Sequence, residues 1–105
     1  MNEKNQNDEN LALVLRALGH PVRLNILRVI AKECKNQCCC TDVTKCFDLA
    51  QSTISQHIKV LFNAGLISKT SKGTRNCYVI YNEKFKIMKK TYDDYLASLD
   101  IKDKK

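Results

Sequence analysis

The clearest alternation of apolar and polar positions lies between Thr41 and Leu66. Val43 and Phe47 are four residues apart, which gives a short first helix one apolar side. The next residues, Asp48–Ala50, are too few for anything except a turn. This stretch therefore predicts a short helix that is followed at once by a tight turn.

A second helix is predicted directly after that turn. Ile54, Ile58 and Leu61 recur at i, i+4 and i+7, and Gly65 follows them as a residue that ends helices. The opposite face is polar and consists of Gln51, Ser52, Thr53, Ser55, Gln56, His57 and Lys59. Two helices joined in this way are typical of a helix-turn-helix, whose second helix enters the DNA major groove.

Two further helices are expected before this motif. The first ends at Gly19-His20-Pro21, because Gly commonly follows a helix and Pro suits the first turn of the next one. The second runs from about Pro21 to Lys32. Their apolar positions are Leu11, Val14, Leu15 and Leu18 in the first helix and Ile26, Leu27 and Ile30 in the second.

The hydrophobic period changes after Gly65. Leu66–Thr70 and Cys77–Tyr81 are rich in β-branched and aromatic residues, which predicts two strands with Ser71–Asn76 as the hairpin tip. A last helix is expected from about Glu83 to Leu99. Its apolar stripe consists of Phe85, Met88, Tyr92, Tyr95, Leu96 and Leu99.

The expected order is helix, helix, helix-turn-helix, two-stranded wing, helix. It predicts a mainly α fold of the winged helix-turn-helix class, in one domain over residues 1–105, with disordered ends at 1–8 and 101–105. The terminal helices have apolar stripes too broad for so small a core, so we expect them to pack across a two-fold axis in a homodimer.

The net charge and the apolar content of the chain limit the classes of partner and the location that we expect. The net charge of +7 favours a polyanionic partner, and nucleic acid is the commonest one. No apolar run approaches the roughly 18 residues of a transmembrane helix, and the polar N-terminal residues predict no secretory signal. We therefore expect a cytoplasmic protein.

The sequence lacks a Gly-rich phosphate loop and a paired acid–base constellation, so an enzyme is not expected.

The polar face of the second motif helix supplies the candidate DNA contacts. Gln pairs bidentately with adenine, Ser and Thr reach base edges or phosphates, and Lys59 lies where it would contact phosphate. Lys72 and Arg75 at the wing tip would reach phosphates or a minor groove. The alternative for all of them is a solvated face, and Ser52 could instead cap the helix. His57 either contacts phosphate or packs at the helix edge.

Five of the six cysteines lie between Cys34 and Cys46. Cytosolic thiols stay reduced, so this clustering favours metal or redox chemistry over a disulfide scaffold. Because Cys38 and Cys40 precede the good N-cap residue Thr41, they are not yet helical and can bind one ion together. Thiolates favour soft metal ions and metalloids.

Three segments resemble the ArsR/SmtB family of metal-sensing bacterial repressors: Ala17–Leu24, Leu49–Leu61 and Ala64–Ile67. The resemblance extends from about Leu11 to Leu99, which is nearly the whole chain. It implies a homodimeric winged-helix repressor that binds double-stranded operator DNA and leaves it when an inducer binds.

The resemblance also implies a ligand set. The family has one inducer site at its third helix, with closely spaced cysteines, and the best match here is Cys38 and Cys40, with Cys39 as a substitute. The family motif has an apolar residue between two cysteines, which this chain lacks. Similar members carry Cys at the position of Cys77, where it would complete a trigonal site, although a half-buried strand residue is the alternative. The inducer would be arsenite or a soft divalent cation, and the fold itself would need no cofactor.

Two other interpretations of the cysteines remain open. Closely set thiols could respond to oxidants or reactive sulfur by forming disulfides or persulfides, in a repressor of the same fold. Alternatively, a structural zinc ion in an interaction module could be held by Cys34, Cys38, Cys40 and Cys46. Their spacing differs from the usual paired C-x2-C form. The family's other inducer site uses Asp, His and Glu on the last helix, which has no His here, so a zinc site there is not expected.

Overall fold

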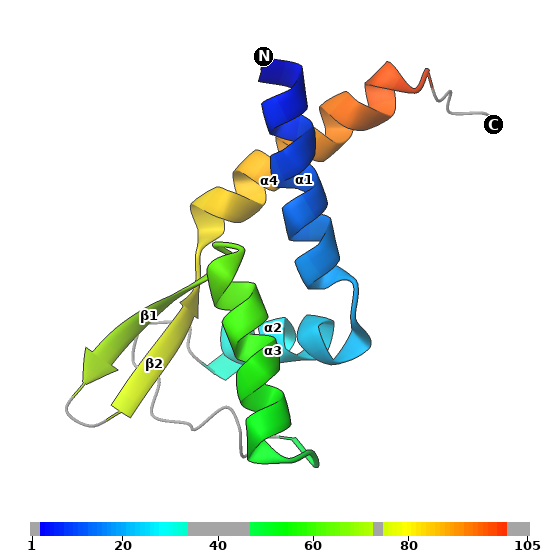
Figure 1. Ribbon diagram of the computed structural model, residues 1–105. Helices are drawn as coiled ribbons and strands as arrows, with labels where there is room; N and C mark the ends of the chain where they lie inside the picture. Colours follow the sequence, from blue (N-terminus) through cyan, green and yellow to red (C-terminus); the bar gives the residue numbers. More distant parts are fainter. Residues whose placement is uncertain (1–2, 34–46, 73–74, 101–105) are drawn as a thin grey trace.

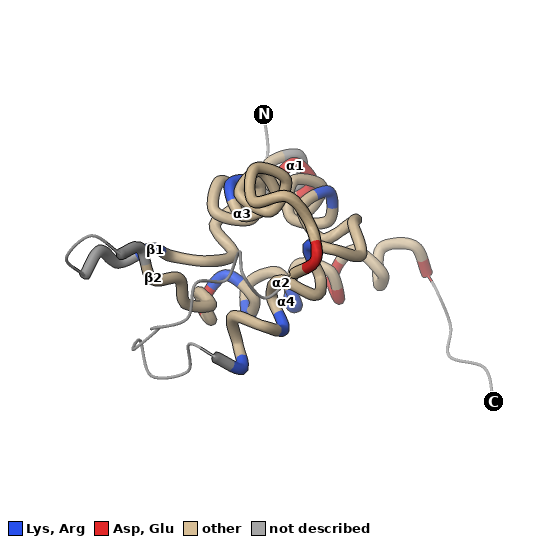
Figure 2. Tube along the Cα trace, turned by 90° about the horizontal axis from the view of Figure 1, so that it is seen from below, with Lys and Arg blue, Asp and Glu red and all other residues tan. Residues whose placement is uncertain are grey.

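The computed structural model describes residues 3–33, 47–72 and 75–100. Its elements are α1 (Glu3–Leu18), α2 (Pro21–Glu33), α3 (Gln51–Asn63), β1 (Ile67–Lys72), β2 (Arg75–Ile80) and α4 (Asn82–Ser98). Helix α3 crosses α2, and the β1–β2 hairpin projects from the helices in two perpendicular views (Figures 1 and 2). The predicted mainly α fold with a small hairpin is confirmed. The expected helix from Thr41 falls on residues outside the described ranges, apart from Phe47.

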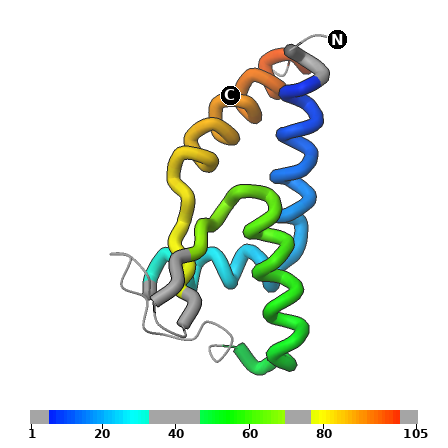
Figure 3. The backbone as a smooth tube through the Cα atoms, turned by 60° about the vertical axis from the view of Figure 1, so that its left-hand side comes forward, coloured from blue at the N-terminus to red at the C-terminus, as the bar shows by residue number. Residues whose placement is uncertain are grey.

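Helices α1 and α4 pack against each other at the end of the molecule away from the wing (Figures 1 and 3). Leu11 and Val14 of α1 are buried, whereas α4 has no buried residue among its described side chains. Within the described ranges, no helix is both long enough and apolar enough to cross a membrane.

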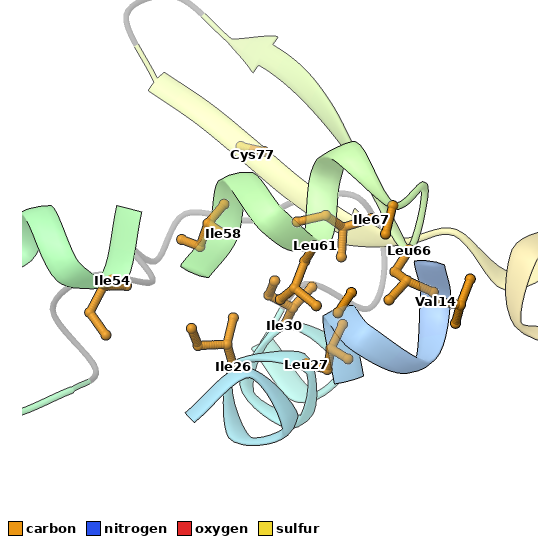
Figure 4. Packing of buried hydrophobic residues seen from close by; sticks show 12 residues of the cluster. Val14, Ile26, Leu27, Ile30, Ile54, Ile58, Leu61, Leu66, Ile67 and Cys77 are labelled. Carbon is orange, nitrogen blue, oxygen red and sulfur yellow. The ribbon is translucent and has the colours of Figure 1, made fainter. Parts of the chain in front are cut away.

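The core lies where α3 packs on α2. Ile54 and Leu61 of α3 are fully buried, Ile58 is 5% exposed, and all three point toward Ile26 and Ile30 of α2 (Figure 4). Complete burial of one such side chain contributes about 1.5–3 kcal/mol to folding. The predicted apolar stripe of the second motif helix is therefore the stripe that fixes α3 on the rest of the protein.

Helix α1 begins much earlier than expected. Residues 3–8 are helical, whereas disorder was expected over 1–8, so that prediction was wrong for the described residues. Glu, Lys and Gln have good helix propensity, and each residue added to an existing helix gains one hydrogen bond. Packing of Leu11 and Val14 supplies the nucleus from which this polar stretch extends.

The wing is longer than predicted. The antiparallel register continues through Ser71↔Asn76 and Lys72↔Arg75, so residues 71–76 are mostly paired strand and only 73–74 lie between the strands. The polar composition had suggested a six-residue tip. Polar residues are compatible with a hairpin ladder because the paired groups belong to the backbone.

Helix α3 ends in a left-handed turn at Gly65, whose φ is 81°. The N–H of Gly65 donates to the carbonyl of Phe62 at 3.0 Å, and the N–H of Leu66 donates to that of Leu61 at 3.1 Å. These two bonds satisfy carbonyls that the helix leaves open and turn the chain toward β1. Gly65 thus ends the helix, as the sequence predicted.

Replacing Gly65 by Ala should lower the free energy of unfolding by about 1–2 kcal/mol. The nearest atoms that the added Cβ would meet belong to the side chain of Lys84, at an ordinary 3.5 Å, so the cost comes from the positive φ. Urea denaturation followed by circular dichroism measures it. Gly65→Asn should cost less, because Asn tolerates the left-handed region. Equal midpoints for the Ala variant and the wild type would contradict this account.

Candidate nucleic-acid interface

The polar residues predicted to contact DNA form an exposed row on α3. They are all exposed in the structure: Gln51, Ser52, Thr53, Ser55, Gln56 and Lys59. The row is opposite the buried stripe of Ile54, Ile58 and Leu61, which packs on α2. Burial of one face therefore determines which side chains the other face presents.

The N-terminal end of α3 differs from one prediction. The helix begins at Gln51, with Ala50 as its N-cap residue, and the carbonyl of Ala50 accepts from the N–H of Thr53 at 3.0 Å. Ser52 therefore lies within the first turn and is not the capping residue. Its hydroxyl belongs to the exposed row, where it can contact a ligand.

The charge on α3 is favourable for a polyanion. The helix has no Asp or Glu, and its only Lys or Arg is Lys59. On the wing, Lys72 and Arg75 are direct partners across the hairpin, at the last pair before residues 73–74. The backbone thus places the two wing residues together at the hairpin end farthest from the helices.

His57 has a different environment from the rest of the polar row. Its ring is half-buried, and Nη1 of Arg23 lies 3.2 Å from Nδ1 of His57. The ring centroids of His57 and His20 are 4.5 Å apart, with an interplanar angle of 55°. The ring of His57 therefore packs at the edge of α3, beside Arg23 and His20.

Arg23 joins α3 to the other helices. Its Nε donates to the carbonyl of Ala17 at 2.7 Å, and its Nη2 donates to that of Arg16 at 3.3 Å. Both carbonyls belong to the last turn of α1, where a cation is favourable. A single guanidinium on α2 therefore contacts the end of α1 and the side of α3.

His20 stabilises the start of α2. Its Nδ1 accepts a hydrogen bond from the N–H of Val22 at 3.1 Å, and its carbonyl accepts from Leu24 at 3.1 Å.

Burial, the neighbouring His20 and the positive charge of Arg23 all lower the pKa of His57 below its ordinary value of 6.5. His57 is therefore neutral at physiological pH.

The contacts of Arg23 and His20 do not follow from the hydrophobic pattern of the sequence. Arg23 lies 34 positions before His57, and helical periodicity describes only contacts within one helix. One signal was available: Gly19-His20-Pro21 marks a helix junction, and an Arg three positions into the new helix lies close to the carbonyls that the preceding helix leaves open.

The cysteine candidates are mostly outside the described residues. This applies to Cys38, Cys39 and Cys40, and also to Cys34 and Cys46. Cys77 on β2 is 2% exposed and belongs to the apolar core, opposite Thr70 in the hairpin register. Over the described ranges, no three His, Cys, Asp or Glu side chains are grouped in a way that could hold a metal ion.

A core-anchored helix with an exposed polar row, followed by a two-stranded wing, defines the winged helix-turn-helix class. A solved ArsR family transcriptional regulator has the same fold, with a TM-score of 0.69 over 91% of this chain and 96% of that chain, at 20% identity. The fold is thus shared at a low level of sequence similarity.

The chain belongs to the ArsR family of bacterial regulatory proteins, whose family model matches residues 20–69. It is 34% identical to an uncharacterised HTH-type transcriptional regulator of Methanocaldococcus jannaschii, over 82% of this chain and 94% of that protein. It is 37% identical to the arsenical resistance operon repressor of Bacillus subtilis, over 65% of this chain and 63% of that repressor. The chain is therefore a DNA-binding transcriptional repressor and not an enzyme.

Proposed function

We propose that the chain reads operator DNA through α3 and is released from it by a thiophilic metal or metalloid bound at Cys38 and Cys40. The observation that supports the reading function is the uninterrupted polar row of α3, opposite a stripe that is almost completely buried. A helix anchored in this way can enter a major groove without exposing core residues.

Individual roles follow from side-chain chemistry. Gln51 and Gln56 can each accept from and donate to adenine, and the hydroxyls of Ser52, Thr53 and Ser55 suit base edges or phosphates. Lys59 and the wing residues Lys72 and Arg75 would contact phosphates or the minor groove, which positions the protein without selecting a sequence. His57 is assigned no direct DNA contact, because its Nδ1 faces Arg23.

We also propose a homodimer that packs through the terminal helices. Helix α4 has 17 residues and none is buried: Tyr92 and Tyr95 are 40% and 41% exposed, and Leu99, the C-cap residue just after the helix, is 50% exposed. These three side chains lie at i, i+3 and i+7, on one face of the helix. An apolar face of this extent is stable in water when a second copy covers it.

The inducer proposal depends on thiol chemistry and on relatives. Arsenite and soft divalent ions prefer thiolates, and the Bacillus subtilis relative is named as an arsenical resistance operon repressor. A cytoplasmic location belongs to this proposal, since thiols remain reduced there. Burial of Cys77 among core residues favours its structural interpretation, so the ligands are assigned to the cluster before α3.

Release requires a difference in affinity. An inducer lowers operator occupancy only if it binds the DNA-free conformation more tightly than the DNA-bound one. Two half-sites of a dimer lie about one DNA turn apart, roughly 34 Å, so a small change in the separation of the two α3 helices weakens both contacts together.

Gln56→Ala should weaken binding to the operator more than binding to random DNA, by about 1–3 kcal/mol for a lost bidentate contact. Lys59→Ala is the matched control on the same face and should weaken binding to both DNAs similarly, with a smaller salt dependence. Fluorescence anisotropy with the two duplexes measures both effects. Equal losses on both duplexes for Gln56→Ala would remove Gln56 from the base-reading residues.

Tyr95→Glu should give a folded monomer with weak operator binding, because the charge lies in the exposed stripe of α4. Ala97→Glu introduces the same charge at an exposed position on a different face and should remain dimeric. Analytical ultracentrifugation at micromolar concentration distinguishes the two states. A wild-type protein that sediments as a monomer would overturn the dimer proposal.

Cys40→Ser should bind operator like the wild type but stay bound when arsenite is added, because one of two thiolate ligands is lost. Cys34→Ser is the control and should be released normally. Anisotropy with arsenite, with a soft divalent cation and with a persulfide donor identifies the inducing chemistry. Normal release of Cys40→Ser by arsenite would exclude the proposed ligand pair, and release by the persulfide alone would favour sulfur sensing.

A further inference from the structure

The guanidinium of Arg23 on α2 contacts both α1 and α3. Arg23 of α2 donates to the carbonyls of Arg16 and Ala17 at the end of α1 and lies 3.2 Å from Nδ1 of His57 on α3. The buried stripe of α3, which packs on α2, is by contrast entirely apolar. Arg23 therefore adds a polar contact at the edge of an apolar helix interface.

The contact determines the protonation of His57. A guanidinium carries a positive charge at all accessible pH values and has no acceptor, so the ring nitrogen that faces it must be unprotonated. The proton of neutral His57 then lies on Nε2. His20 is constrained similarly, because its Nδ1 accepts from the N–H of Val22.

We propose that Arg23 and His57 form a positioning link that fixes the orientation of α3 relative to α1, and that the link holds only while His57 is neutral. The inference rests on the proposed reading function of α3. Arg23 and His57 are positioning residues, since they act through the exposed row and not on DNA itself.

The link lies where an orientation error matters. The apolar stripe limits how deeply α3 lies in the core, but apolar contacts are not directional. A hydrogen bond to a charged donor is directional and stronger than a neutral one. Helix α1 is one of the terminal helices through which the homodimer is proposed to pack. The same link therefore relates the orientation of each α3 to that of the α3 in the partner.

The pH dependence follows from the charges around His57. Among the described residues, the neighbours of its ring are His20, just before α2, and Arg23 within α2, and Arg23 in turn donates to two backbone carbonyls of α1. Burial, then His20, then the positive charge of Arg23 lower the pKa of His57. The link is therefore complete at and above pH 6.5 and is lost as the pH falls through the lowered value.

The experiment compares two duplexes at about pH 8 and at a pH below the lowered pKa of His57, which titration of the His57 ring locates. One duplex is enriched by the wild-type protein from a random pool, and the other has the same composition in scrambled order. The measured quantity is the ratio of the two affinities, because added positive charge strengthens binding to any DNA and cancels in the ratio.

His57→Asn is the decisive variant, since its side-chain oxygen can accept from Arg23 near the position of Nδ1 and does not titrate. It should keep the wild-type ratio at the higher pH and retain it at the lower pH, where the wild type loses it. His57→Ala should lose about tenfold in the ratio at both pH values. The control His20→Asn keeps a good cap and the Arg23–His57 contact, so it should also lose the ratio at the lower pH, at a pH no lower than the wild type does because one cause of the lowered pKa of His57 is removed.

Two outcomes overturn the link. One is a wild-type ratio for folded His57→Ala at both pH values, and the other is an acid-induced loss in His57→Asn equal to that of the wild type. If His57→Ala does not fold, His57→Asn alone decides.

If α3 does not bind DNA in a sequence-specific way, the wild-type protein will enrich no duplex from the random pool. This result is distinct from a failure of the Arg23–His57 link. The link is then tested without DNA by ¹⁵N spectra of the His57 ring. The ring should be the Nε2–H tautomer at the higher pH, and Arg23→Gln should raise the pKa of His57 by removing the adjacent charge. An unchanged pKa in Arg23→Gln would exclude the contact.

Discussion

Burial of one apolar stripe on α3 determines the organisation of the rest of the molecule. Ile54, Ile58 and Leu61 are removed from water against α2, and this fixes both the position of the helix and the set of side chains on its outer face. Among the described residues, no polar or charged residue is buried in this core. The polar contacts that orient α3 are therefore confined to its edge.

The element order could be predicted from the sequence because each helix and strand has its own hydrophobic period. The end of α3 was predictable for a local reason, since Gly65 takes a backbone conformation that few other residues tolerate. The start of α1 and the length of the wing were not, because both depend on extension of structure through polar residues. Composition alone does not distinguish such residues from a loop.

The candidate site also has parts that the sequence predicts and parts that it does not. Exposure of the α3 row follows from periodicity, so its residues could be named in advance. The environment of His57 depends on Arg23, which is distant in sequence, and no local pattern reports a hydrogen bond between two helices. Burial of Cys77 likewise depends on which face of β2 packs on the helices, and a strand of mixed composition gives little indication of that face.

The turn at Gly65 has a mechanical consequence. Only Ala64, Gly65 and Leu66 separate α3 from β1, and the carbonyl of Leu66 accepts from the N–H of Tyr81 at 3.0 Å, just beyond the end of β2. This bond closes the base of the hairpin directly beside the end of α3, so few rotatable backbone bonds separate the helix from the wing. If α3 and the wing contact DNA as proposed, a half-site whose groove geometry does not match the distance between them would have to bend or twist, and the stiffness of the flanking DNA would contribute to selectivity.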